Sequence, residues 1–127
     1  LNFYDVHYAS THVTGTTGGN IDDMMEAINM ISRRQIDPAS MITHVGGLNC
    51  VVDTTLNLPK LPGGKKLIYT HLDMPLTAIG DFKKLGETDS FYRSLSGIVE
   101  RHGGLWNAEA EACLLAHCEA EEEREAI

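Results

Sequence analysis

A glycine-rich turn close to the start of the chain constrains its fold more than any other feature. Residues 12–23 read His-Val-Thr-Gly-Thr-Thr-Gly-Gly-Asn-Ile-Asp-Asp, so a short β-type run enters the turn and a helix leaves it. Gly15, Gly18 and Gly19 permit positive φ and close approach of a ligand to the backbone. Asn20 is a favourable N-cap for the helix that follows. The turn is therefore expected to join a strand to a helix.

The same turn leaves two interpretations open. It can be a tight connection with no further role, or it can contact a ligand through its backbone. Neither GxGxxG nor GxxxxGKS/T occurs in the chain, and Asp22 and Asp23 add negative charge in the first helical turn. These carboxylates disfavour a bare phosphate at this helix end. A ligand here is expected to present a neutral polar group.

Composition narrows the class of protein. The 127 residues suit one domain or a piece of one, and the leucine at position 1 leads us to expect an excised or truncated segment. No apolar run approaches the roughly 20 residues that span a bilayer. Residues 119–125 supply half of the net charge of −8, and this acidity disfavours nucleic acid and anionic membranes as partners. Three cysteines without CxxC spacing are expected to be reduced thiols of a cytoplasmic protein.

Residues 1–74 alternate between strand-like and helix-like patterns. Aromatic and β-branched residues predict one or two short strands within residues 1–14. A regular helical pattern runs from Ile21 to Arg34, with four apolar residues on one predicted buried face: Met24, Ala27, Ile28 and Ile31. A strand over residues 40–45 is expected to be broken by Gly46-Gly47. The next helix should bury Leu48, Val51, Val52 and Leu56, and Lys65 to Leu72 should form another strand.

This order predicts an α/β fold with a largely parallel sheet. The second part, residues 75–127, is instead expected to be helical. Thr88 can cap a helix that runs to about His102, and Asn107 can cap another. Trp106, between the two helices, is expected to pin them onto the body of the protein.

The residues alone do not name a reaction. Cys113 and His117 have the i, i+4 spacing of metal ligands on one helix face, but zinc needs two further ligands. His44, at the end of a predicted strand, is expected to be a hydrogen-bonded structural histidine. No GxSxG nucleophile motif occurs.

Three ordered segments resemble the C-terminal part of a medium-chain zinc-type alcohol dehydrogenase. Residues 15–23 are similar to the family's Gly-Ser-x-x-Gly-Asn-x-x-Asp stretch, which follows its last Rossmann strand. Residues 41–45, Met-Ile-Thr-His-Val, resemble the family's Leu-Ile-Thr-His return to the catalytic domain. Residues 64–69, Gly-Lys-Lys-Leu-Ile-Tyr, are similar to its closing Gly-Lys strand. Residues 2–8, 58–66 and 104–106 are most similar to the subgroup of sugar-alcohol and sugar-phosphate dehydrogenases that includes sorbose-1-phosphate reductase.

The resemblance implies the last strand-helix units of a Rossmann-type parallel sheet (residues 1–74) and a C-terminal helical extension (residues 75–127). It implies hydride transfer between NAD or NADP and a polyol or sugar phosphate, with zinc in the full-length enzyme. The family holds the nicotinamide carboxamide at the positions of Gly15, Thr16, Thr17 and Gly18, through backbone groups of Thr16 and Gly18. Lys65 or Lys66 falls near the family's basic residue that faces the pyrophosphate, and the register leaves both open. A homo-oligomer is also implied.

The sequence lacks several motifs of the family, and this limits the function that the segment can have alone. The pyrophosphate loop, the zinc ligands and the four-cysteine lobe are all absent from the sequence. The segment is therefore expected to hold no catalytic residue and no zinc ligand, and to be inactive alone. The alternative is a free-standing α/β module that binds a partner or a ligand without catalysis.

Overall fold

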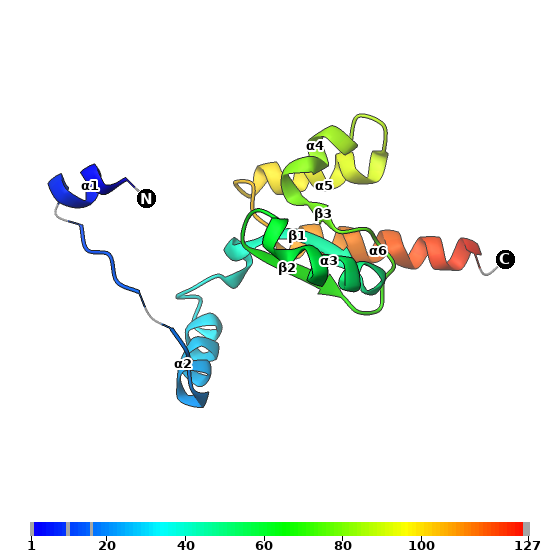
Figure 1. The fold of residues 1–127 in the computed structure, drawn as a ribbon. Coiled ribbons are helices and arrows are strands. Elements are labelled where there is room, and N and C mark those ends of the chain that lie inside the picture. Colours follow the sequence, from blue (N-terminus) through cyan, green and yellow to red (C-terminus); the bar gives the residue numbers. More distant parts are fainter. Residues whose placement is uncertain (1, 10, 16, 126–127) are drawn as a thin grey trace. The chain divides into compact units, whose positions relative to one another are not determined.

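A computed structural model describes residues 2–9, 11–15 and 17–125, with side chains described up to residue 118. The chain forms two compact units, Leu1–Ile36 and Asp37–Ile127 (Figure 1).

The first unit contains two helices and no strand among its described residues. Helix α1 spans Phe3–Tyr8, so the prediction of strands within residues 1–14 is wrong for this part. The Asn2 side chain accepts a hydrogen bond from the Tyr4 amide at 3.1 Å and donates one to the Asp5 carboxylate at 2.7 Å. The rings of Tyr4 and Tyr8 lie one helical turn apart, with centroids 4.5 Å from each other. A strand needs a neighbouring strand for its backbone hydrogen bonds, and the described residues of this unit offer none. The segment instead satisfies its backbone locally, as a helix.

Helix α2 spans Ile21–Ser32, close to its predicted bounds. Asn20 caps it as predicted, in a capping box with Asp23. The prediction that its apolar face is buried is wrong for this structure, since Met24 is 65% exposed and Ile28 is 53% exposed. The helix forms as its local sequence predicts, but no other described residue of the first unit covers its apolar face.

The second unit is mixed α/β and is built on a three-stranded sheet with the order β2-β1-β3 (Figure 1). Strand β1 (Ile42–Gly47) pairs in parallel with β2 (Lys65–Tyr69), as predicted. The connection between them is made by helix α3 (Val51–Asn57). Strand β3 (Thr77–Ala78) pairs antiparallel with β1 and was not predicted. The sheet is therefore parallel on one side only, and it has no further strand among the described residues.

Gly46 and Gly47 do not break β1 but form its end, which corrects the prediction. A Cβ atom on Gly47 would lie 2.2 Å from the Leu72 carbonyl oxygen and 2.5 Å from the Met74 nitrogen. The Gly47 amide donates to the Met74 carbonyl and the Leu48 amide donates to the Leu72 carbonyl, both at 2.9 Å. Glycine is needed because another backbone lies directly against the strand.

Helix α3 does not bury the predicted face. Leu48, Val52 and Leu56 are exposed, and Thr54 is its buried residue. A 3₁₀ turn, Leu48–Cys50, precedes the helix. The predicted buried face assumed one continuous α-helix from Leu48 to Leu56. A 3₁₀ turn has fewer residues per turn than an α-helix, so it shifts which side chains share a face.

Three further helices complete the unit: α4 (Phe82–Leu85), α5 (Ser90–Arg101) and α6 (Ala108–Glu125). Asp89 caps α5 in place of the predicted Thr88, and Asn107 caps α6 as predicted. Trp106 is buried at 3% exposure, as expected of a residue that holds the helices to the body. The core combines strand, loop and helix residues in one cluster: Val45, Tyr69, Leu72, Met74, Ile79, Phe82, Leu95, Ile98, Val99, Trp106, Ala110 and Leu114.

This core includes residues from both sides of the predicted boundary between residues 74 and 75. The compact units of the structure divide instead between Ile36 and Asp37. The boundary at 74 concerns domains of a longer protein and stays a prediction. No helix in the described ranges has the length and apolar character that crossing a membrane requires.

Gly47→Ala should destabilise the second unit, because the added methyl group would overlap the backbone of Leu72 and Met74. The free energy of unfolding in urea should fall by about 1–3 kcal/mol or more. Gly80→Ala is the matched control, since a Cβ atom there meets nothing within 4 Å, and it should stay within about 0.5 kcal/mol of the parent. Equal stability of the two variants would contradict the close approach.

Candidate functional site

The glycine-rich turn is an exposed, irregular segment of the first unit. Gly15, Thr17 and Gly18 are all exposed, and Thr16 lies outside the described residues. Gly18 has φ +73°, and a Cβ atom at Gly15 or Gly18 would meet no heavy atom within 4 Å. The backbone of this turn is therefore open to a ligand, and Gly18 adopts the left-handed conformation that glycine favours.

The adjoining helix end is already satisfied by its own side chains. The Asn20 side-chain oxygen accepts from the Asp22 amide at 2.7 Å and from the Asp23 amide at 3.1 Å. The Asp23 carboxylate accepts from the Asn20 amide at 2.8 Å. Because the first amides are engaged and two carboxylates stand beside them, this end does not suit a bare phosphate. A neutral amide group is compatible with it.

The two candidate lysines differ sharply in their contacts. The Lys66 ammonium donates to the Gly64 carbonyl at 2.8 Å and to the Pro62 carbonyl at 2.9 Å, with the Gly63 carbonyl at 3.5 Å. It thus closes the loop before β2, in which Gly63 has φ +81°. Lys65 is exposed. The Lys66 ammonium is therefore held by backbone carbonyls of the loop. The Lys65 ammonium makes no ion pair among the described residues.

His44 is buried at the centre of the sheet, as expected of a structural histidine. Its Nδ1 lies 2.9 Å from the Thr43 hydroxyl, and it pairs in register with Lys66 on β2 and with Ala78 on β3. Burial, and then the nearby charge of Lys66, lower the pKa of His44, while Asp81 opposes this effect. The ring is therefore kept neutral by its surroundings.

The glycine turn belongs to the first unit and the lysines to the second. Their contribution to one cofactor site stays a prediction. No cluster of His, Cys, Asp or Glu in the described ranges could hold a metal ion. The His117 ring, half of the predicted i, i+4 pair with Cys113, stacks on Phe91 with centroids 3.9 Å apart.

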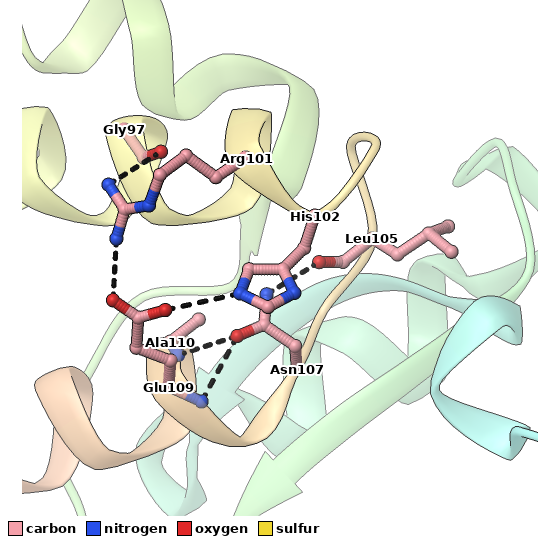
Figure 2. Close-up of polar contacts among 7 residues, drawn as sticks. All are labelled: Gly97, Arg101, His102, Leu105, Asn107, Glu109 and Ala110. Atoms are coloured by element: carbon pink, nitrogen blue, oxygen red, sulfur yellow. Dashed lines mark hydrogen bonds and ion pairs between the residues drawn. The ribbon is translucent and has the colours of Figure 1, made fainter.

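One polar cluster was not found from the sequence. Figure 2 shows the Glu109 carboxylate between Arg101 and His102, at the junction of α5 and α6. It accepts from the Arg101 guanidinium at 2.5 Å and lies 3.1 Å from His102 Nε2. Gly103 and Gly104, both with positive φ, turn the chain between the two helices. The signal was an acidic residue two positions after the Asn107 cap, opposite the basic end of the preceding helix.

Comparisons with known proteins identify relatives but no structural match. No protein-family model matches the chain, and no solved structure matches it. The chain is 56% identical over 116 residues to the uncharacterised protein YggP of Escherichia coli (strain K12). It is 50% identical over 115 residues to mannitol-1-phosphate 5-dehydrogenase of Aliivibrio fischeri, and 48% identical over 119 residues to L-sorbose 1-phosphate reductase of Klebsiella pneumoniae. These alignments cover at least 91% of this chain but only 27% of each relative, so the chain spans about a quarter of their length.

Lys66→Met should raise the pKa of His44 toward its ordinary value, because a positive charge that lowers it is removed. It should also accelerate amide hydrogen exchange at Gly63 and Gly64, because the loop loses the ammonium group that its carbonyls share. NMR titration of the histidine and exchange rates measure both effects. Lys65→Met is the matched control and should change neither. Identical behaviour of the two variants would contradict the division of roles.

Glu109 should give the junction of α5 and α6 an acid-sensitive contact. The hydrogen bond with His102, and then the contacts with Arg101, lower the pKa of this carboxyl group from its ordinary value of 4.5. A carboxylate of this kind stabilises the fold above its unfolded pKa and loses that contribution as the pH falls through the folded pKa. Glu109→Gln should therefore weaken the fall in melting temperature below about pH 5.

The control for this test is Glu100→Gln on α5, which leaves the Glu109 contacts in place. It should keep the acid sensitivity of the parent chain. The same flattening in both variants would rule out a specific role for Glu109.

Proposed function

Because this chain is homologous over nearly its whole length to part of two sugar-phosphate oxidoreductases, as its motifs predicted, we propose that it is a segment of an NAD(P)-dependent, zinc-type enzyme. The enzyme would oxidise an alcohol group of a polyol or sugar phosphate, or reduce the corresponding carbonyl group. The observation that carries the proposal is 48–50% identity to proteins named for these reactions.

We propose that the glycine turn forms part of the nicotinamide pocket. Its exposed backbone, open at Gly15 and Gly18, can offer amide and carbonyl groups to the neutral carboxamide of the cofactor. The capped and acidic start of α2 is compatible with a neutral group and unfavourable for a phosphate. NAD(P) would supply the hydride, and the role of these residues would be to bind and orient the ring.

Of the two lysines, Lys65 is the better candidate for the cofactor pyrophosphate. Its side chain is exposed, whereas the Lys66 ammonium already donates to the loop carbonyls. A phosphate would have to displace those carbonyls from Lys66, but it could approach Lys65 without breaking a contact within the chain. Zinc would be held by residues outside this segment.

Uncovered apolar faces support a segment of a larger protein over a free-standing module. The apolar face of α2 is exposed in the first unit, and Leu48, Val52 and Leu56 are exposed in the second. Exposed apolar faces of this kind are typically covered by another protein surface or promote association. We also propose that the enzyme is cytoplasmic and homo-oligomeric.

The longer protein should consume NAD(P)H with L-sorbose 1-phosphate or reduce NAD(P)⁺ with mannitol 1-phosphate, measured by absorbance at the nicotinamide band. The isolated 127 residues should show no turnover. In the longer protein, Lys65→Met should raise the KM for NAD(P)H roughly tenfold through loss of a charged hydrogen bond. Lys66→Met should change that KM much less.

Two outcomes would contradict the proposal. One is zinc-dependent NAD(P)H oxidation by the isolated segment. The other is a folded longer protein that uses neither polyol phosphates nor sugar phosphates with either cofactor.

A further inference from the structure

A small pocket lies where the sheet meets the start of helix α6. Its volume is about 350 Å³, close to the lower limit for small-molecule sites. The pocket is walled mainly by apolar groups, and Glu111 is its charged residue. The lining is completed by Pro38, Ala39, Ile42, Leu67, Trp106, Asn107 and Ala108.

The Glu111 carboxylate is held in place by a buried relay. Its Oε1 accepts a hydrogen bond from the Tyr69 hydroxyl at 2.7 Å, and that hydroxyl accepts one from Trp106 Nε1 at 3.3 Å. Tyr69 and Trp106 are both buried. Burial, and then the hydrogen bond to Glu111, raise the pKa of Tyr69, so its hydroxyl remains the donor. One oxygen of Glu111 is therefore oriented by the core, and its Oε2 accepts no hydrogen bond from the described residues.

The charge of Glu111 has no cationic partner in the described part of the chain. The ion pairs there join Lys83 to Glu100, and Arg101 and His102 to Glu109. Glu111 is also half-buried beside apolar groups, where the attraction between opposite charges is stronger than in bulk water. The pocket thus presents a fixed negative charge at one side and an apolar wall at the others.

We propose that this pocket binds a primary alkylammonium group with a short aliphatic stem. The ammonium would bind Glu111 Oε2, and the stem would lie against the apolar lining. A compact ammonium fits better than a guanidinium, because a bidentate fork would have to share Oε1 with the Tyr69 hydroxyl, whereas an ammonium can bind Oε2 alone. A divalent metal is disfavoured because hard cations need six or more oxygen ligands. The group can belong to a free amine or to a lysine side chain of another polypeptide.

Trp106 provides a direct test, because it is the single tryptophan of the chain and lines the pocket. Titration of the 127-residue chain with n-butylammonium chloride should change its fluorescence saturably, with a dissociation constant on the order of 1 mM. n-Butanol and sodium butyrate, of matched size, should give no saturable change. Blocked lysine, N-acetyl-lysine methylamide, distinguishes the two sources. Binding tighter than butylammonium indicates a polypeptide lysine, and weaker binding indicates a free amine.

Glu111→Gln should weaken butylammonium binding at least tenfold, while its amide oxygen can still accept from Tyr69. Glu109→Gln is the matched control, since it removes a carboxylate from the same helical turn outside the pocket, and it should bind like the parent. The proposal is overturned if butylammonium gives no saturable change, if butanol gives the same change, or if Glu111→Gln binds as well as the parent. None of these readouts uses NAD(P) or a sugar phosphate, so the proposed function stands or falls separately.

Discussion

The close contact between the end of strand β1 and the Leu72–Met74 backbone is the constraint on which the second unit depends. Two hydrogen bonds, from Gly47 and Leu48, join these segments, and glycine at position 47 leaves the space they need. The contact directs the chain, after it leaves β2, across the end of β1 toward the opposite edge of the sheet. Strand β3 can then pair with β1 there, so β1 becomes the central strand and its Val45 is completely buried.

A second connection joins this sheet to the helices that follow it. Tyr69 at the end of β2 donates to Glu111 on α6 and accepts from Trp106, which also contacts Phe82 edge-on with ring centroids 6.3 Å apart. Buried hydroxyl and indole groups need such partners, and here each satisfies another. The strands and the helical segment therefore share one core, and the same relay orients the carboxylate of the pocket beside α6.

The described candidate cofactor residues differ from this core, since they lie in an exposed turn or at the start of the edge strand β2. The glycine turn is open, and its neighbouring helix end is satisfied by Asn20 and Asp23. The two lysines are adjacent but differ in their contacts, because the loop carbonyls accept hydrogen bonds from Lys66. The relatives that the chain matches are about four times as long as the chain.

The sequence determined helices α2, α5 and α6 and the caps Asn20 and Asn107, because these features depend on residues a few positions apart. It also indicated the β1–β2 pair and the resemblance to sugar-phosphate oxidoreductases, because these follow from the order of its motifs. Only the tertiary structure decided that Gly46 and Gly47 complete a strand, that β3 pairs antiparallel, and that α2 and α3 leave apolar faces uncovered. It also gave Lys66 a structural role and left Glu111 without a cation among the described residues. These features depend on which distant segments come together, and spacing along the chain carries no direct record of such contacts.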